Sequence, residues 1–190
     1  MMRYKRKFKQ LVHDVPERIF VRLRDPKEFS IWLEKQRGKR PLRGELGMGT
    51  GDFLVHEAKI HPDVFFLGVE IKEERIFKAY NKAESLHVSN IAFLQVPIQE
   101  LTRYKLPKLE KLYLLFPDPW PKKKHAKRRL TSPVFLDLYR SLLKNEGELL
   151  LKTDQEALHL YSQEMFLQHA WNISRQQKNF KTPEEEMTAY

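Results

Sequence analysis

A short stretch near the middle of the chain combines an acid, an indole ring and a dense run of positive charge. Asp118 and Trp120 stand between three prolines at alternate positions, and six Lys or Arg residues follow within Lys122–Arg129. A carboxylate and a flat aromatic ring beside clustered cations indicate a site that grips a base on a phosphate backbone. A solvated charged loop, with the Trp packed in the core, is the alternative interpretation.

The segment before this stretch fixes its place in the fold. The apolar run Leu112–Phe116 predicts a strand that is buried on both faces. Proline cannot donate a ladder hydrogen bond, so the strand must stop where the prolines begin. Open α/β sheets bind their ligands at the carboxyl ends of the strands, which favours the functional interpretation.

A glycine-rich stretch forms a second candidate site. Its core reads Glu45-x-Gly47-x-Gly49-x-Gly51. A strand, a glycine turn and a helix in this order would let the backbone approach a ligand at the helix N-terminus. The spacing is not that of a dinucleotide-binding fingerprint, and the Gly-Lys-Ser/Thr ending of a P-loop is absent. A tight structural turn is the alternative.

An acidic residue follows the glycine turn at a sequence separation typical of nucleotide-binding folds. Glu70 ends the apolar run Val64–Val69 and lies nineteen residues after Gly51. In nucleotide-binding α/β folds, an acid about 20 residues past the glycine turn holds the ribose hydroxyls. It could instead be the first-turn charge of the next helix. The glycine turn upstream favours the ribose role.

The elements that must position these residues alternate between strands and helices. Further strands are predicted at Ile91–Val96, at Glu148–Lys152 and near Trp171–Gln176. Helices are predicted at Phe29–Leu33, at Lys72–Leu86, from Pro133 to a stop at Gly147, and from Thr153 onward. The alternation predicts an α/β fold with a doubly wound, mostly parallel sheet covered on both faces.

Length and composition set the broad class. The 190 residues predict a single domain overall, with a basic N-terminal arm and helix in residues 1–40 and the main domain in residues 41–190. Thirty-five Lys and Arg against 25 Asp and Glu give a net charge of +10. This excess favours an anionic partner, nucleic acid before a membrane surface.

Several classes of protein are disfavoured. No apolar run approaches the ~20 residues of a membrane span, and no secretory signal follows the basic start, so we expect no membrane partner. The absence of cysteine fits a cytoplasmic protein. No metal site is expected either, because the seven histidines are scattered and His56 and His61 lack other obvious ligands.

These motifs resemble a known family. The glycine motif followed by Gly68-Val69-Glu70 resembles the cofactor half of class I S-adenosylmethionine-dependent methyltransferases. The stretch from Phe116 to Arg129 closely resembles the signature of the tRNA (guanine-N7) methyltransferase family, and Thr153-Asp154 fits that family's next motif. The resemblance covers residues 42–190.

The resemblance implies a Rossmann-like fold, an activity and a set of roles. It implies transfer of a methyl group from S-adenosylmethionine, released as S-adenosylhomocysteine, to N7 of a guanine in the tRNA variable loop, by a monomer or homodimer and without a metal. Asp118 would be the catalytic residue and would also lie close to the donor. The other donor contacts would come from Glu45, Gly47, Gly49, Gly51, Glu70 and Gln95. The substrate or RNA contacts would come from Trp120, Lys122, Lys124, His125, Lys127, Arg128, Arg129, Asp154 and Thr188.

The sequence departs from the family pattern at two places. The family commonly has an acid just after the third strand, where this chain has Gln95-Val96-Pro97, so Gln95 is the polar candidate for an adenine contact. The family also has a Thr-x-x-Glu motif, but here the sequence stops two residues after Thr188. We therefore expect an incomplete final strand.

Three rival functions stay open at this point. A non-catalytic tRNA- or RNA-binding module with a degenerate methyltransferase fold would bind tRNA but not the methyl donor. A methyltransferase acting on another RNA, or on protein, would share the donor half. A nicotinamide-dependent dehydrogenase would share the sheet and the ribose acid, but the glycine spacing disfavours it.

Overall fold

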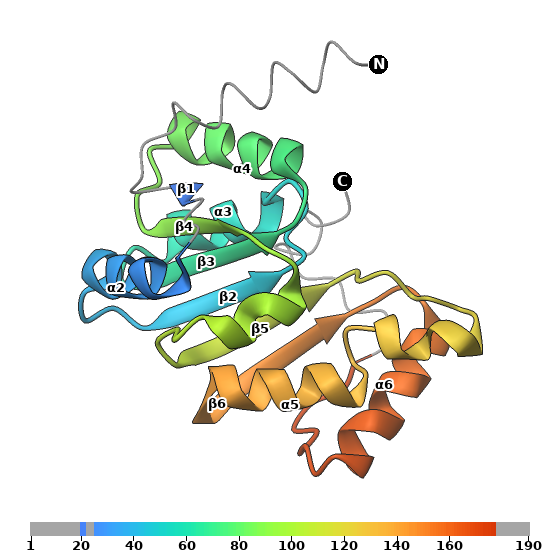
Figure 1. Ribbon diagram of the computed structural model, residues 1–190. Helices are drawn as coiled ribbons and strands as arrows, with labels where there is room; N and C mark the ends of the chain where they lie inside the picture. Colours follow the sequence, from blue (N-terminus) through green and yellow to red (C-terminus); the bar gives the residue numbers. More distant parts are fainter. Residues whose placement is uncertain (1–19, 22–24, 178–190) are drawn as a thin grey trace.

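The computed structural model describes residues 20–21 and 25–177. These residues form one six-stranded sheet, parallel throughout, in the order β1-β4-β3-β2-β5-β6 (Figure 1). The strands are β1 (Phe20–Val21), β2 (Leu42–Leu46), β3 (Phe65–Glu70), β4 (Ile91–Gln95), β5 (Leu109–Leu115) and β6 (Leu143–Lys152). The helices are α2 (Pro26–Arg37), α3 (Asp52–Ile60), α4 (Glu73–Ser85), α5 (Pro133–Leu142) and α6 (Glu156–Gln168). Two 3-10 helices, η1 (Ile98–Arg103) and η2 (Lys123–Arg128), complete the described elements.

Helices cover both faces of the sheet, which confirms the doubly wound α/β prediction. On one face α3 and α4 pack their apolar sides, including Leu54 and Ile76, against Phe66 and Phe93 of the sheet. On the other face a larger cluster joins α2, α5 and η1 to the remaining strand residues. The fully buried Phe29 of α2 belongs to that cluster, so this helix packs into the same core as the sheet.

The predicted elements are confirmed where the apolar pattern was strong. Six successive residues of β3 are buried, as expected for a strand covered on both faces. Helix α4 lies between Lys72 and Leu86, which form its caps. Helix α2 is longer than predicted because Asp25 caps its N-terminus by accepting a hydrogen bond from Lys27 N (2.8 Å), and Pro26 follows as the first helical residue.

Two predictions about the second half of the chain were wrong. Gly147 does not end a helix; α5 ends at Leu142, and Gly147 lies inside β6, where the pairing with β5 shifts register. A Cβ on Gly147 would lie 3.0 Å from Lys144 O and 3.1 Å from Leu109 O, so glycine allows this irregularity. No strand forms at Trp171–Gln176, because Trp171 N donates to Phe166 O and continues the turn that closes α6.

The order of the strands defines where a ligand would bind. Strand β2 is central, with β3 on one side and β5 on the other. The strands that follow β2 are added first on one side, as β3 and β4, and then on the other, as β5 and β6, so the strand order switches at β2. Ligands of open α/β sheets lie outside the carboxyl ends of the strands at such a switch point. Within the described part of the chain, no helix is long and apolar enough to cross a bilayer. The same residues contain no group of three or more metal-ligating side chains.

Candidate functional site

The carboxyl ends of the strands bring the predicted site residues to one edge of the sheet. Strand pairing sets Glu45 of β2 opposite Gly68 of β3, and Glu70 of β3 opposite Gln95 of β4. At the other side of β2, Phe116 N donates a hydrogen bond of 2.8 Å to Lys152 O, which ties the end of β5 to the end of β6. Residues that are distant in sequence therefore lie along the same edge of the sheet.

The glycine turn between β2 and α3 has left-handed backbone at three positions. Gly47, Gly49 and Gly51 have φ values of 75°, 58° and 72°. Gly47 N donates to Val69 O (2.8 Å) and Gly49 N to Glu70 Oε2 (3.2 Å), so the turn is fastened to the end of β3. A Cβ on Gly47 or Gly49 would meet nothing within 4 Å, so space for a ligand lies directly beside this backbone.

Gly51 differs, because it is needed for packing. It caps α3, and a Cβ there would lie 2.6 Å from Ala79 Cβ of α4. We expect Gly51→Ala to lower the free energy of unfolding by about 2–4 kcal/mol, since left-handed strain and a steric clash add. Gly47→Ala is the matched control with strain but no clash, and should cost only about 1–2 kcal/mol. Urea denaturation of both variants measures the difference, and equal losses would refute the packing role.

Glu70 is held rigidly at the end of β3. Its side chain is 5% exposed, and Oε1 accepts hydrogen bonds from Ile71 N (2.8 Å) and Lys72 N (2.9 Å). Oε2 accepts from Gly49 N and, at 3.4 Å, from Arg75 Nη1. The Arg75 contact is the longest of the four and comes from a largely exposed side chain, so a ligand hydroxyl could replace it.

Glu45 is a buried acid whose charge the fold does not compensate. The residue is 4% exposed, and its Oε2 has no hydrogen-bond partner within the described residues. Burial raises the pKa of this carboxyl group well above its usual value, and the negative charges of Asp52, Glu57 and Glu70 raise it further. A buried acid with an unpaired oxygen near the carboxyl end of β2 is one that a ligand donor or cation could pair with.

The raised pKa of Glu45 predicts a pH dependence of stability. A carboxyl group with a higher pKa in the folded state stabilises the fold fully below its unfolded pKa, and loses that contribution as pH rises through the folded pKa. We therefore expect Glu45→Gln to raise the melting temperature at neutral pH, by about 2–4 °C for each kcal/mol gained, and to have no such effect in acid. Thermal melts across pH, with the exposed Glu146→Gln as control, measure this; a neutral-pH gain of zero would contradict it.

A cavity lies at this edge of the sheet and is bordered by residues from three strand ends. Gly47, Glu70 and Val96 line it where β2, β3 and β4 finish. Gln95 does not line it; its Nε2 donates to Ile71 O (3.3 Å). The uncharged polar side chain among the lining residues belongs to Gln99, two residues after Pro97, and no motif in the sequence marks it.

The chain after η2 forms another wall of the same cavity. Arg128, Leu130 and Phe135 line it. No local motif marks Leu130 and Phe135 as site residues, because ordinary apolar side chains of this kind are also the commonest core residues.

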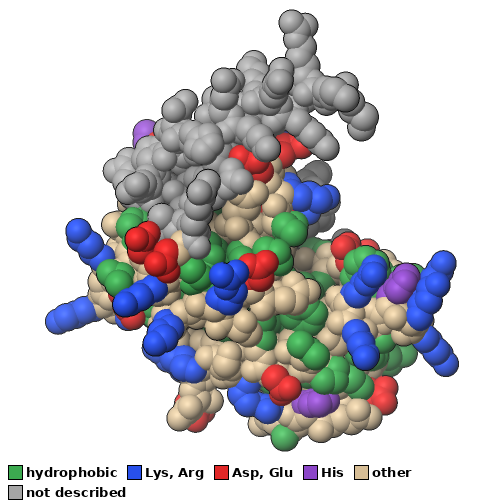
Figure 2. Space-filling view, in the orientation of Figure 1, with side chains coloured by type: hydrophobic (Ala, Val, Ile, Leu, Met, Phe, Trp, Pro, Cys, Tyr) green, Lys and Arg blue, Asp and Glu red, His purple; other side chains and the backbone are tan. Residues whose placement is uncertain are grey.

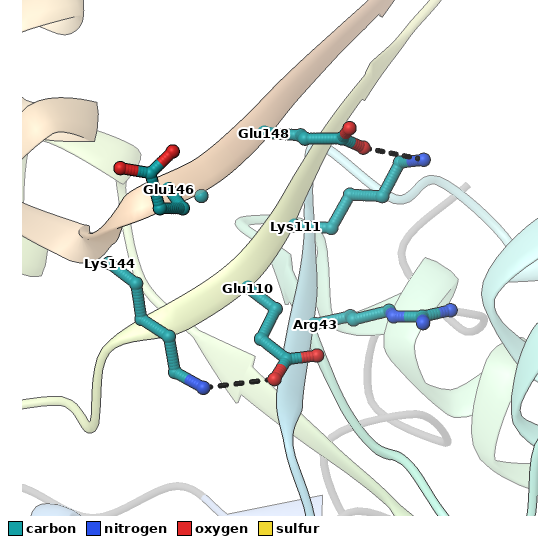
Figure 3. A pocket seen from close by; sticks show the side chains of 7 residues that line it. Arg43, Glu110, Lys111, Lys144, Glu146 and Glu148 are labelled. Carbon is teal, nitrogen blue, oxygen red and sulfur yellow. Dashed lines mark hydrogen bonds and ion pairs between the residues drawn. The ribbon is translucent and has the colours of Figure 1, made fainter.

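A second cavity lies at the opposite, amino-terminal edge of the sheet (Figure 3). Its charged lining side chains largely pair with one another: Lys111 Nζ is 3.1 Å from Glu148 Oε2, and Lys144 Nζ is 2.9 Å from Glu110 Oε1. It lies away from the glycine turn and from every predicted site residue. The cavity beside Glu70 is therefore the candidate ligand site.

The proline turn after β5 presents Asp118 between two strained aromatic residues. Phe116 and Trp120 have φ values of 47° and 41°, which non-glycine residues rarely adopt. Asp118 is exposed, and its carboxylate has no hydrogen bond or ion pair to another described residue. Backbone strain that persists around a free carboxylate is typical of functional turns.

The cationic segment divides into exposed and engaged residues. Lys and Arg side chains project at the right-hand end of Figure 2, where Figure 1 places η2. Lys122, Lys124 and Lys127 are exposed. Arg129 is half-buried and engaged instead: its Nε and Nη2 donate to Trp120 O at 3.2 and 3.1 Å, and its guanidinium lies 4.3 Å from the ring centre of Tyr161.

Trp120 is also engaged within the protein. The ring of His125 meets it edge-on at 5.6 Å, and the guanidinium carbon of Arg128 lies 5.0 Å from its centre. Both half-buried rings thus brace the proline turn against η2 in this conformation. Asp154 is exposed just before α6, two residues beyond the backbone bond that joins β5 and β6. Thr188 lies outside the described residues.

Comparison with protein families identifies the larger part of the chain. Residues 39–190 match a family model described as "Putative methyltransferase". A tRNA (guanine-N(7)-)-methyltransferase of Alkaliphilus oremlandii is 36% identical over 168 residues, which are 87% of this chain and 77% of that protein. The corresponding enzyme of Staphylococcus carnosus is 37% identical over 84% of this chain and 74% of its own length.

Another relative is matched over less of its length. The enzyme of the same name from Brevibacillus brevis is 40% identical over 136 residues, which are 71% of this chain and 64% of that protein. The chain therefore spans somewhat less than two thirds of this relative.

Solved structures agree in fold. A ribosomal protein L11 methylase from Lactobacillus delbrueckii superposes with a TM-score of 0.58 at 12% identity, covering 81% of this chain and 75% of that one. TrmN from Thermus thermophilus superposes with a TM-score of 0.53 at 22% identity, covering 70% of this chain and 40% of that one. At these identities the likeness concerns the fold alone.

Proposed function

Because this chain belongs to the tRNA (guanine-N(7)-)-methyltransferase family, we propose that it transfers a methyl group from S-adenosylmethionine to N7 of a guanine in tRNA. One observation supports this most strongly. The cavity beside Glu70 and the glycine turn lies on the same edge of the sheet as the Asp118 turn and the exposed lysines. A donor site, a carboxylate and an RNA-binding surface are then adjacent. The variable loop of tRNA is the substrate region that the motif resemblance implies, and the cytoplasm is the expected location.

The residues at this edge of the sheet suit the donor chemically. Glu70 is fixed so that it can accept hydrogen bonds from the ribose hydroxyls, with the weak Arg75 contact giving way. Gly47 and Gly49 leave open space beside the backbone. The uncompensated Glu45 carboxyl group can pair with the positive charge of the donor's amino-acid part, which restores its ionised form.

The reaction needs positioning and charge stabilisation rather than a base. Guanine N7 carries a free lone pair on the major-groove edge, so no proton has to leave before it attacks. When bound, S-adenosylmethionine supplies an electrophilic methyl group on a sulfonium. As the N7–carbon bond forms and the carbon–sulfur bond breaks, positive charge moves onto the purine.

Asp118 is the residue that we propose acts on that charge. Its free carboxylate can stabilise the positive charge that develops on the purine and can accept hydrogen bonds from the base edge. The prolines and the positive φ values of Phe116 and Trp120 restrict the backbone of the turn that carries Asp118. In-line alignment of the two reacting atoms would supply most of the remaining acceleration.

Methyl transfer from labelled S-adenosylmethionine to unmodified tRNA tests the proposal directly. Digestion of the product should release N7-methylguanosine. If another nucleoside carried the label, the substrate class would have to be changed. Donor binding without transfer would limit these 190 residues to part of the activity. If tRNA bound but the donor did not, the non-catalytic RNA-binding module would replace the enzyme.

A further inference from the structure

Arg128 is exposed like the lysines of η2, but it differs from them in bordering a cavity. It lines the cavity beside Glu70, whereas no lysine of η2 does. Glu70 and Arg128 are the two residues with charged side chains among the described residues that line this cavity. One acidic and one basic residue therefore border the cavity.

The position of Arg128 is supported by the proline turn. Its guanidinium carbon lies 5.0 Å from the ring centre of Trp120, and Arg129 in turn holds Trp120 O. Within the described residues, the guanidinium of Arg128 has no carboxylate partner and no hydrogen bond. A cation that packs beside an aromatic ring, belongs to a residue bordering the cavity and has its donors unused can receive an anionic group.

We propose that Arg128 binds the carboxylate of the methyl donor, an assignment that rests on the proposed function. That carboxylate is the only anionic group of S-adenosylmethionine, and a guanidinium pairs with a carboxylate through two parallel hydrogen bonds. Glu70 carries the same sign as the donor's carboxylate, so the two acids bind different parts of the donor. Arg128 thus contributes to the donor site, while the lysines beside it, which do not border the cavity, are left to contact the RNA.

Two ligands that differ in the carboxylate separate this role from a structural one. S-adenosylhomocysteine contains the amino-acid carboxylate, and methylthioadenosine lacks it but keeps the adenosine and the sulfur. We expect Arg128→Ala to weaken S-adenosylhomocysteine binding about 10- to 100-fold and to leave methylthioadenosine binding unchanged, as measured by calorimetry. Arg128→Lys should recover part of the affinity, because it keeps the charge but loses the two-bond geometry.

The neighbouring Lys127 provides the matched control. It is exposed and does not line the cavity, so Lys127→Ala should bind both ligands as the unchanged protein does. Equal weakening of both ligands by Arg128→Ala, or no weakening of either, would overturn the assignment to the carboxylate. If the unchanged protein bound neither ligand, the proposed function itself would fail, and that result is distinguishable because it requires no variant.

Discussion

Asp118→Asn should abolish methyl transfer while leaving the fold intact. The amide keeps the size of the side chain but loses the negative charge that would stabilise the purine as it becomes positive, so we expect kcat to fall by at least about 10²–10³-fold. Asp118 is exposed and makes no hydrogen bond or ion pair with another described residue, so its replacement removes no contact from the described fold. Single-turnover transfer from labelled donor to tRNA measures the loss.

The control for this substitution is an acid of similar exposure at the other edge of the sheet. Asp63 lies exposed in the loop before β3, at the amino-terminal edge, and Asp63→Asn should transfer methyl groups normally. Binding of tRNA and of S-adenosylhomocysteine by Asp118→Asn should stay within a few-fold of the unchanged protein. Near-normal turnover by Asp118→Asn would remove Asp118 from the mechanism.

Replacing three exposed lysines of η2 should weaken tRNA binding in a salt-dependent manner. Lys123, Lys124 and Lys127 are all exposed, so their combined change to Ala removes phosphate contacts without disturbing the core. Each lost contact should lower the slope of log affinity against log salt by about 0.7–0.9, or about 2–3 in total. Titrations at several salt concentrations measure both the affinity and the slope.

A charge-matched variant distinguishes local contacts from net charge. Lys35, Lys39 and Lys59 are exposed near the amino-terminal edge of the sheet, and their change to Ala removes the same three charges. That variant should keep the slope of the unchanged protein. Equal slopes for the two triple variants would mean that η2 is not the RNA-binding segment and that the +10 net charge acts only at long range.

The sequence allowed the glycine turn and the position of Glu70 to be predicted because both features are local. The turn between β2 and α3 has left-handed backbone at three positions, and only glycine adopts this conformation readily. The spacing of the glycines in the sequence therefore predicts the turn. Glu70 is visible for a similar reason, since it ends a run of buried apolar residues at a fixed distance from the turn. Neither the glycine spacing nor the position of Glu70 depends on contacts between residues distant in sequence.

The roles within the cationic segment could not be separated from sequence. Arg128 and Arg129 are identical neighbours in the sequence, yet one lines the cavity and the other clamps Trp120 O against α6. That difference depends on how η2 lies over the strand ends and α6, which is a matter of tertiary packing. Similarly, Gly147 has the sequence pattern of a helix stop. In the structure, its missing side chain leaves room for the carbonyl oxygens of Lys144 and Leu109 to approach its backbone.

The strained turn around Asp118 also has a consequence for directed evolution. Left-handed backbone at a non-glycine residue costs about 1–2 kcal/mol, and the turn carries this strain at both Phe116 and Trp120. Selection for heat resistance alone would therefore favour Gly or Asn at Phe116, which is 43% exposed, because they relieve the strain there. Such clones would melt at a higher temperature but transfer methyl groups more slowly, since the backbone of the turn that carries Asp118 would be less restricted. A screen that measures both heat resistance and methyl transfer would separate residues that stabilise the fold from residues that destabilise it but are needed for activity.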